Sequence, residues 1–255
     1  MFKYKKFTRK LKSKRVLMNK MPKFEKLRKK YLELTKNRIR TASLGGEFIL
    51  QSFKSIKEIE HSINLLCLKL REWYAYYYPE IEHEIRNNEL FIEKVLENPK
   101  RKTSMGCEII KEKDVNEMIS LAKQIKNLLD YDKKLEQYLD NLLEEFCPNT
   151  KIIAGNKITC LMLEQAGNLK NLAEMPASTI QLLGAEKALF RHLSEGGKSP
   201  KFGFLYGHEL VKKSKNKGKT AKLIADKISI SIKVDYFKGK FIGNELKKEI
   251  EKRLR

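Results

Sequence analysis

Lysine and arginine side chains gather in residues 178–222, where their types and spacing fit the binding of phosphate. From residue 187 to residue 222, ten Lys or Arg stand against two Glu. Lys187 and Arg191 are four residues apart, so a helix would project both from one face. Cations at this density bind the phosphates of a nucleic acid without reading its sequence. A solvated loop without a ligand is the alternative interpretation.

A helix junction precedes these cations. The dipeptide Gly184-Ala185 is followed by a helical pattern that runs to about Leu193. The missing side chain at Gly184 would let a backbone approach closely, and free amides at a helix start favour phosphate. The junction therefore strengthens the prediction of a phosphate-binding surface.

Two enzyme motifs fail on their spacing. Residues 218–220 spell Gly-Lys-Thr, but a P-loop needs another glycine five positions before Gly218, and the chain has Lys213 there. His192 and His208 lack a Ser or Cys nucleophile at a recognisable spacing. No carboxylate cluster or set of metal ligands is evident either, so we predict a protein that is not an enzyme. His208 is expected to donate to RNA, to cap a loop or to pack.

The composition favours a polyanionic partner. Lys and Arg outnumber Asp and Glu by 54 to 32, a formal charge of +22. Nucleic acid is the leading candidate, and a lysine-rich proteome is the alternative explanation. The four cysteines form no CxxC pair and the histidines stand at no ligand spacing beside them. We expect core cysteines in a reducing compartment, without zinc, disulfides or any cofactor.

The start of the chain is the most basic part of it. Residues 1–40 contain 17 Lys or Arg against two Glu, which is about two thirds of the net charge. We expect a flexible first half, or one ordered only on an anionic partner, and a helix that begins near Lys23. A solvated tail and an RNA-clamping arm both fit. No apolar run approaches the ~20 residues that span a bilayer and no signal peptide is evident, so we expect an intracellular, soluble protein without a membrane partner.

Two long segments carry apolar residues at steps of three, four and seven, which make one face of a helix. The first starts near Ile49 and ends in WYAYYYP, and the second starts after Asp114, its expected N-cap, and ends at Phe146. Two helices of about 30 residues, ~45 Å long, can pack antiparallel as a coiled coil. The tip between them, residues 77–113, is then the expected contact with another protomer.

The aromatic end of the first segment allows two interpretations. Trp73 and Tyr74 could stack on bases, but they lie where the apolar face continues. We therefore expect both to pack in the core. Pro79 stops the helix after them.

A compact helical domain follows Pro148. Its expected elements are helices at about 157–166, 168–173, 176–183 and 220–234, a loop at 238–243 and a final helix from Glu245. The run FGFLY is expected to bury Phe204 and Leu205. ISISI would also suit a strand, but its flanks favour a helix. The prediction is an all-α chain with a basic N-terminal arm (1–30), a helical coiled-coil domain (31–147) and a compact helical, RNP-binding domain (148–255).

Four segments carry a resemblance to a known family: INLLCLKLREWYAYYYPE, IQLLGAEKALFRHL, PKFGFLYGHELV and GKTAKLIADKISISIKVDYF. They stand in consistent order within residues 30–255. The chain resembles the Nop family, the core scaffold proteins of box C/D small ribonucleoproteins, in its archaeal form. The resemblance implies a coiled-coil domain that forms a homodimer and a Nop domain that binds kink-turn RNA together with its ribosomal-type kink-turn protein.

The resemblance also implies which residues and partners take part. Such scaffolds do no chemistry, and fibrillarin in the same particle methylates the ribose 2′-hydroxyl of a target RNA. The GAEKALFRHL region and the cations after it face the RNA-protein composite, which here implies Gly184, Glu186, Lys187, Leu189, Arg191, Lys198 and Lys201. The candidate interface is completed by Ala185, His208, Lys212, Lys213, Lys215, Lys217, Lys219 and Lys222.

One part of the family pattern is missing from this sequence. Members usually carry an α/β domain before the coiled coil, and that domain docks fibrillarin, whereas about 30 residues precede the matching region here. The resemblance therefore implies that fibrillarin belongs to the particle. It does not imply that fibrillarin docks directly on this chain alone. A Nop module of another particle, such as a spliceosomal one, and a basic coiled-coil protein that coats RNA are the alternatives. The expected location is the cytoplasm of an archaeal cell, or the nucleolus of a eukaryotic one.

Overall fold

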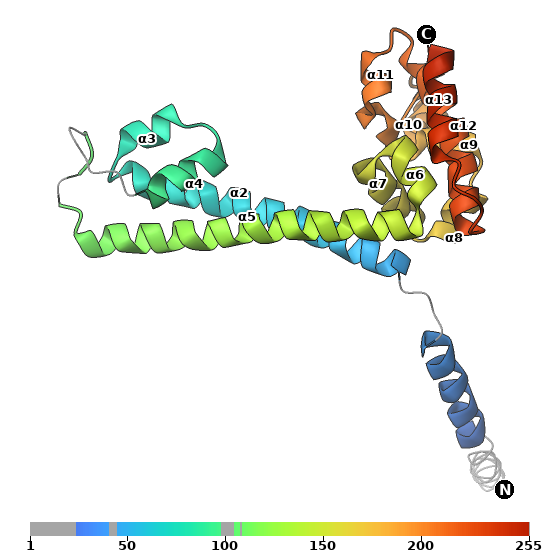
Figure 1. Cartoon of the computed structure of the whole chain (residues 1–255), viewed down its shortest axis with the longest axis horizontal. Coiled ribbons are helices and arrows are strands. Elements are labelled where there is room, and N and C mark those ends of the chain that lie inside the picture. Colours follow the sequence, from blue (N-terminus) through green and yellow to red (C-terminus); the bar gives the residue numbers. More distant parts are fainter. Residues whose placement is uncertain (1–23, 41–44, 98–104, 108, 255) are drawn as a thin grey trace, which may run out of the picture. The chain divides into compact units, whose positions relative to one another are not determined.

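The structure is a computed structural model, and the residues that it describes are 24–40, 45–97, 105–107 and 109–254. They form helices joined by loops, with no strand among them, so the predicted all-α fold is confirmed (Figure 1). The chain divides into two units, Met1–Leu44 and Gly45–Arg255. None of the described helices is both long enough and apolar enough to cross a membrane.

The described part of the first unit is a helix over residues 24–40. All of these residues are helical, in agreement with the helix predicted in this segment. Every one of its residues is exposed, including Phe24 and Tyr31. The flexible first half of the predicted arm lies outside the described residues.

The second unit begins with two long helices and two short ones between them. These are α2 (Gly45–Ala75), α3 (Pro79–Glu84), α4 (Asn88–Leu96) and α5 (Glu112–Phe146). The rest of the unit consists of α6 (Pro148–Ala154), α7 (Asn156–Ala166), α8 (Leu169–Glu174), α9 (Ala177–Leu182), α10 (Glu186–Glu195), the 3-10 helix η1 (Phe204–Gly207), α11 (Glu209–Lys213), α12 (Lys217–Tyr236) and α13 (Gly243–Leu254).

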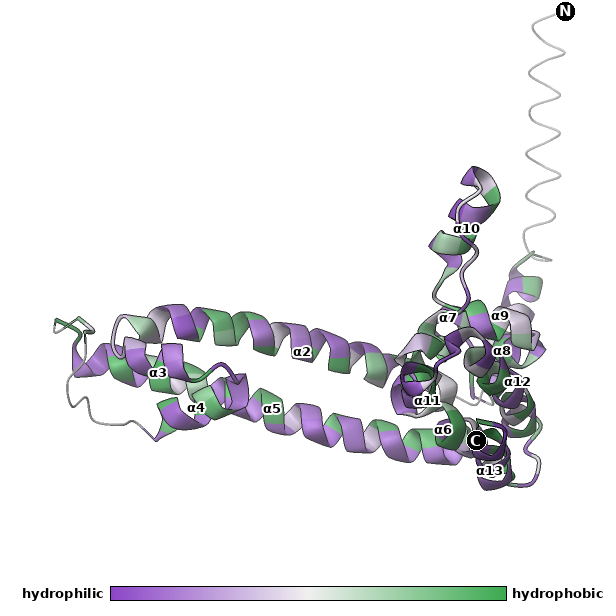
Figure 2. Cartoon of the chain, turned by 90° about the horizontal axis from the view of Figure 1, so that it is seen from above, coloured by the Kyte–Doolittle hydropathy of each residue, from purple (hydrophilic) through white to green (hydrophobic). Residues whose placement is uncertain are grey.

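Helices α2 and α5 form the predicted antiparallel arm (Figures 1 and 2). The buried side chains between them follow the helical repeat: Ile56, Ile63, Cys67 and Leu70 of α2, and Met118, Ala122 and Ile125 of α5. The start of α5 differs from the prediction, because the helix begins at Glu112 and its N-cap is Lys111. Asp114 still caps the helix, but from its third position, where the carboxylate accepts the Lys111 backbone N–H at 3.3 Å.

The aromatic end of α2 separates into a buried and an exposed residue. Tyr74 is fully buried and packs edge-on against Phe91 of α4, with 5.9 Å between the ring centroids. Trp73 is 41% exposed, so its predicted place in the core is wrong. The reason is helical geometry: Leu70 and Tyr74 continue the buried stripe at a spacing of four, and Trp73 is turned away from Tyr74 by about 100°.

Three of the four cysteines are core residues, as predicted. Cys67, Cys147 and Cys160 are buried, and burial raises the pKa of the Cys147 and Cys160 thiols to about 12. None of the four cysteines, all of which lie among the described residues, is part of a disulfide bond. Cys107 differs from the prediction because its side chain is exposed at the tip of the arm, where its backbone N–H donates to the Tyr76 carbonyl at 2.8 Å.

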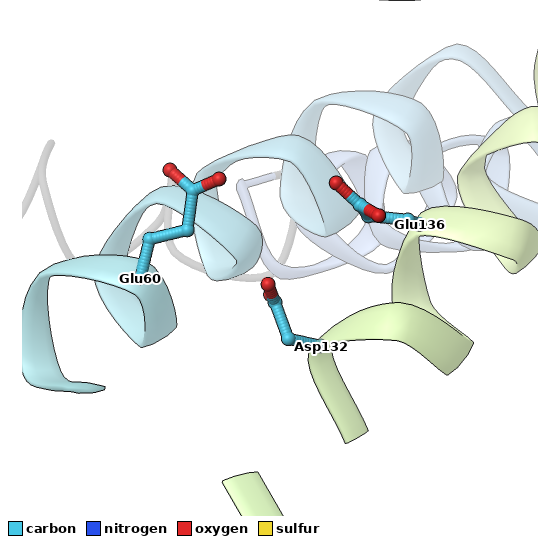
Figure 3. Close-up of side chains that lie close together, drawn as sticks. All are labelled: Glu60, Asp132 and Glu136. Carbon is cyan, nitrogen blue, oxygen red and sulfur yellow. The ribbon is translucent and has the colours of Figure 1, made fainter. Parts of the chain in front are cut away.

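A group of three carboxylates spans the middle of the arm, which sequence spacing did not indicate. Glu60 of α2 points toward Asp132 and Glu136 of α5 (Figure 3), and carboxylate oxygens of the three lie within 4.8 Å of one another. One oxygen of Asp132 is buried without a hydrogen-bond partner. The pKa of Asp132 is raised, first by burial and then by the charges of Glu136 and Glu60. Oxygen ligands suit Mg²⁺ or Ca²⁺, but exposed acidic groups of this kind are common without an ion, and we assign none here.

Replacing Asp132 by Asn should therefore stabilise the arm. Because its folded-state pKa lies above the unfolded value, ionised Asp132 weakens the fold, and this cost fades as the pH falls toward the raised pKa. We expect a gain of about 0.5–1 kcal/mol at pH 7 that shrinks toward pH 4, measured by thermal unfolding at several pH values. Asp130→Asn, at an exposed position on the same helix, is the control. A destabilised Asp132→Asn chain at pH 7 would contradict this reading of the carboxylates.

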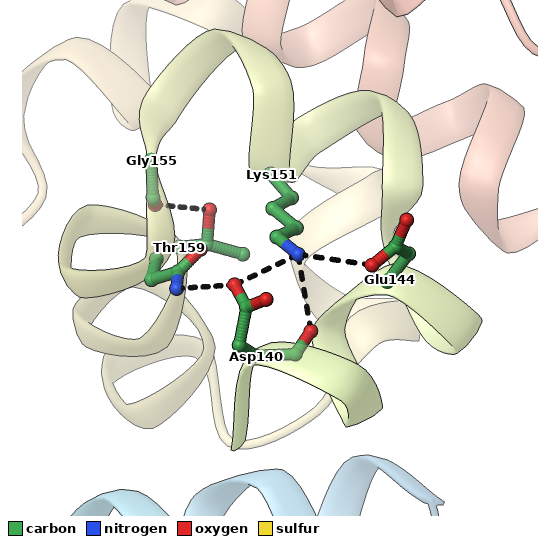
Figure 4. Close-up of polar contacts among 6 residues, drawn as sticks. Asp140, Glu144, Lys151, Gly155 and Thr159 are labelled. Atoms are coloured by element: carbon green, nitrogen blue, oxygen red, sulfur yellow. Dashed lines mark hydrogen bonds and ion pairs between the residues drawn. The ribbon is translucent and has the colours of Figure 1, made fainter. Parts of the chain in front are cut away.

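Polar contacts join the arm to the helical domain at the end of α5 (Figure 4). Lys151 of α6 donates to the Asp140 carboxylate at 2.8 Å and lies 3.4 Å from that of Glu144. The Asp140 carboxylate also accepts the Asn156 amide at 2.7 Å. These bonds lower the pKa of Asp140, the Lys151 bond most. One aspartate thus ties the arm to the start of α6 and to α7.

The core of the helical domain is built around α12. Ala221, Ile224, Ile228 and Ile232 are fully buried at helical spacing, so the ISISI segment is helical as predicted. This core continues into the base of the arm through side chains such as Leu143. Phe204 packs partly buried against it and Leu205 is fully buried. The division of the chain after residues 30 and 147 stays a prediction.

Candidate RNA and ribonucleoprotein interface

Helix α10 stands out from the helical domain on a clamped base (Figure 2). The segments that lead into and out of it are joined by backbone hydrogen bonds: Gly203 N–H donates to the Gln181 carbonyl at 2.9 Å, and Phe204 N–H to the Leu183 carbonyl at 2.7 Å. The Gln181 side-chain amide donates to the Lys201 carbonyl at 2.6 Å. The base of the projection is therefore fixed.

Two glycines permit the close approach of these segments. Gly184 has a φ of +86°, and a Cβ atom there would lie 2.5 Å from the Phe204 ring. The group that approaches Gly184 closely is thus the side chain of Phe204, whereas the sequence predicted a backbone segment. A Cβ atom on Gly203 would lie 1.9 Å from the Leu183 carbonyl oxygen, so only glycine fits this position. Sequence reasoning missed Gly203, whose only signal is its place inside FGF.

The start of α10 uses some of its amides within the protein. Gly184 N–H donates to the Glu186 carboxylate at 2.8 Å, and Ala185 N–H donates to the Leu182 carbonyl at 2.8 Å. The negative charge of Glu186 also stands where a phosphate was expected. The amides of Gly184 and Ala185 are therefore unavailable to a ligand.

Helix α10 presents an apolar face beside a cationic edge. None of its residues is buried, and Phe190 and Leu193 are 72% and 75% exposed. At 100° per residue, Leu189, Phe190 and Leu193 share one face. Lys187 and Arg191 are exposed too, and by the same count they lie beyond Phe190, on the side of the helix away from Leu189 and Leu193. A helix of this kind can contact an apolar protein surface and a phosphate at the same time.

The remaining predicted cations lie on the loop after α10, on α11 and at the start of α12. The exposed ones are Lys198, Lys201, Lys212, Lys213, Lys215, Lys219 and Lys222. The structure brings some of them together: the aliphatic part of Lys201 lies against Gly218. Lys213 is 3.6 Å from the Glu209 carboxylate in an exposed ion pair, which contributes little. The loop and the start of α12 thus form one cationic surface.

Aromatic rings support part of this surface. Phe202 and Tyr206 are stacked with 5.2 Å between their centroids, and the Lys217 ammonium lies 5.1 Å above the Tyr206 ring. This contact holds Lys217 by a cation–π interaction.

Two candidate residues have internal structural roles. His208 caps α11: its Nδ1 accepts the Leu210 N–H at 3.2 Å, and its Nε2 contacts the Ile153 carbonyl at 2.8 Å. Its ring therefore has no spare nitrogen for RNA, and we leave it out of the proposed interface. Thr220 lies in the first turn of α12, where its hydroxyl donates to the Asn216 carbonyl at 3.2 Å. The Gly-Lys-Thr tripeptide thus starts a helix.

Comparison with known proteins identifies the family. The family model "Nop: snoRNA binding domain, fibrillarin" matches residues 55–255, most of the chain. The chain belongs to the Nop family. The match contains the whole of the α10 projection and the cationic surface.

Named relatives share this sequence over most of the chain. A NOP5 family protein of Methanocaldococcus jannaschii is 35% identical over 249 residues, covering 87% of this chain and 60% of that protein. Nucleolar protein 58 of Schizosaccharomyces pombe is 34% identical over 239 residues, covering 81% of this chain and 47% of that protein. The Nop chain thus spans about half of the length of these relatives.

A solved structure shares the fold. The crystal structure of a fibrillarin/Nop5p complex matches with a TM-score of 0.54 and 24% identity, covering 91% of this chain and 79% of that one. At this identity the likeness concerns the fold alone.

Proposed function

We propose that this chain is a non-enzymatic scaffold of a box C/D guide ribonucleoprotein. It binds the composite surface of kink-turn RNA and its ribosomal-type kink-turn protein, and it supports RNA 2′-O-methylation by fibrillarin. Membership of the Nop family supports an RNA-binding role, since the family description names a snoRNA-binding domain and fibrillarin. The scaffold contributes position, which accelerates a reaction that fibrillarin carries out.

The observation that carries the proposal is the exposure of α10. Phe190 and Leu193 stand in solvent beside Lys187 and Arg191 on a clamped base. A bare duplex offers phosphate to the cations but nothing to the apolar face. A kink-turn with its bound protein offers phosphates to the cations and a protein surface to the apolar side chains. This composite therefore accounts for both kinds of exposed residue on α10.

The cations beyond α10 would extend the contact along the RNA backbone. Contacts of Lys198, Lys201 and the α11–α12 lysines to phosphate give affinity and orientation without sequence preference. Selection of the correct RNA then comes from the shape of the kink-turn and from its protein.

Cooperative binding tests the proposal. In a gel-shift assay the chain should bind a box C/D kink-turn RNA weakly alone, and at least roughly tenfold more tightly once an archaeal ribosomal-type kink-turn protein is bound. A regular RNA duplex of the same length, incubated with the same protein, is the control. Equal affinity for the duplex and for the complex would show a protein that merely coats RNA.

The arm is the proposed means of joining two scaffolds. Apolar side chains remain exposed on α2 and directly after it: Leu65, Leu68 and Tyr76 are 54%, 53% and 68% exposed. Exposed apolar stripes of this kind mark protein interfaces. We propose that the tip of the arm forms a homodimer, which a dimeric mass in light scattering would support and a monomeric mass would contradict.

Fibrillarin enters as a partner of the assembled particle. The solved structure of similar fold is a complex of Nop5p with fibrillarin, and relatives from eukaryotes carry the name nucleolar protein. The proposed location is accordingly the cytoplasm of an archaeal cell, or the nucleolus of a eukaryotic one.

A further inference from the structure

The turn between α12 and α13 exposes aromatic rings on a part of the domain that the proposed interface does not use. Tyr236, Phe237 and Phe241 are 37%, 77% and 50% exposed, and the rings of Tyr236 and Phe237 meet edge-on at 5.0 Å. Large apolar side chains in such a cluster are uncommon on a surface without a partner. The cluster therefore requires an explanation.

A buried hydrogen-bond network holds both ends of this turn. The Asp235 carboxylate accepts the Asn149 N–H at 3.1 Å and its side-chain amide at 2.7 Å, and it accepts the Thr150 N–H at 2.9 Å and its hydroxyl at 2.6 Å. The side-chain oxygen Oδ1 of Asn149 in turn accepts the Ile242 N–H at 2.7 Å and the Gly243 N–H at 2.8 Å. The exposed rings thus stand on a rigid base.

The backbone of the turn places a lysine where glycine is usual. Gly239 N–H donates to the Val234 carbonyl at 2.8 Å and Lys238 N–H to the Asp235 carbonyl at 3.2 Å, which is the Schellman pattern. Lys238 occupies its left-handed position with φ +53°, the one positive φ of a non-glycine residue among those that the structure describes. A lysine is less stable there than glycine, so the turn presents this side chain at a cost in stability.

The exposed charged side chains from residue 233 to residue 243 are all lysines. Lys233, Lys238 and Lys240 are exposed. The nearby Asp235 is buried, and its carboxylate already accepts hydrogen bonds from Asn149 and Thr150. Glu245 in the next helix is the closest exposed carboxylate along the chain after the turn. A partner of this surface must therefore combine negative charge with flat apolar groups.

We propose that the α12–α13 turn binds single-stranded RNA, with bases stacked on Phe237 and Phe241 and phosphates held by Lys233, Lys238 and Lys240. Aromatic side chains interleaved with cations are the usual platform for unpaired nucleic acid. A duplex does not fit, because its bases are already stacked on each other. This contact is additional to kink-turn binding and does not depend on it.

The first test measures binding of a fluorescein-labelled oligouridine of about 10 nucleotides to the whole chain by anisotropy. Phe237→Ala with Phe241→Ala should weaken binding roughly tenfold or more. Tyr131→Ala with Tyr138→Ala removes two exposed rings of α5 and should leave affinity unchanged. Unchanged affinity in the Phe237/Phe241 variant would overturn the proposal, as would a wild-type chain that prefers a duplex of equal length.

The second test separates binding from folding. Lys238→Gly should raise Tm by about 2–4 °C, because glycine accepts the left-handed backbone, while it weakens oligouridine binding. A variant that binds as tightly as the wild type would remove Lys238 from the site. Photo-crosslinking with 4-thiouridine RNA should also label the tryptic peptide VDYFK, residues 234–238. Labelling confined to other peptides would instead place unpaired RNA on the α10 side and overturn the assignment.

Discussion

A chain that carries Lys187→Glu and Arg191→Glu should assemble roughly 100-fold more weakly with a kink-turn RNA and its protein than the wild type does. Each cation makes a charge-assisted contact to phosphate under the proposed function, and such contacts contribute about 1.5–3 kcal/mol each. The glutamates would also repel the backbone. Both residues are exposed on a helix without buried side chains, so the fold should be unaffected. A gel-shift titration of the ternary complex measures the change.

The control for this variant carries the same change of net charge elsewhere. Lys123→Glu with Lys134→Glu alters two exposed lysines of α5, and it should change assembly only through the general loss of positive charge, a few-fold at most at physiological salt. Light scattering should give the same mass for both variants and the wild type. Ternary assembly as tight as that of the wild type would remove α10 from the interface.

The arrangement of helices could be predicted because the apolar residues repeat. The stripes from Ile49 and from Val115 recur at steps of three and four, and the structure places long helices at both. The same repeat correctly predicted that ISISI is part of a helix, since Ile224, Ile228 and Ile232 continue one face. The prediction for Trp73 was wrong because the apolar face was continued at a step of three from Leu70, whereas the buried stripe continues at a step of four, at Tyr74.

The exposure of α10 could not be predicted in the same way. Leu189, Phe190 and Leu193 have the spacing of a buried face, and spacing does not reveal whether another element covers it. In the structure nothing among the described residues buries Phe190 or Leu193. Phe190 and Leu193 were therefore missed, while Leu189 was named only through the family resemblance and the charged residues were found from their density in the sequence.

Contacts between segments that are far apart in the chain also could not be predicted from the sequence. Glu60 meets Asp132 across the arm, and Asp235 meets Asn149 from 86 residues away. No local pattern marks such pairs, because their geometry is set by how the helices pack. The resemblance to the Nop family supplied the fold class and the candidate surface, but not these pairs.

Asp235 should be among the most sensitive positions of the helical domain. Asp235→Ala would remove the acceptor of four donors, the N–H groups and side chains of Asn149 and Thr150, in a buried site. Each buried donor that is left without an acceptor costs about 1–3 kcal/mol. Water molecules that enter the vacated site would recover part of the total cost. We expect a loss of about 4 kcal/mol and a Tm lowered by roughly 10 °C, measured by circular dichroism.

Two companion variants show whether the hydrogen bonds cause this loss. Asp235→Asn keeps the size of the side chain but turns two donors toward the N–H groups, so it should also destabilise the chain, by less than alanine does. Asp226→Ala removes an exposed carboxylate from the same helix and should change Tm by no more than about 2 °C. Because Asn149 also holds the start of α13, Asp235→Ala should weaken oligouridine binding at the α12–α13 turn even at a temperature where the chain stays folded. An alanine variant as stable as the wild type would mean that water replaces the carboxylate, and the turn would then owe its rigidity to packing alone.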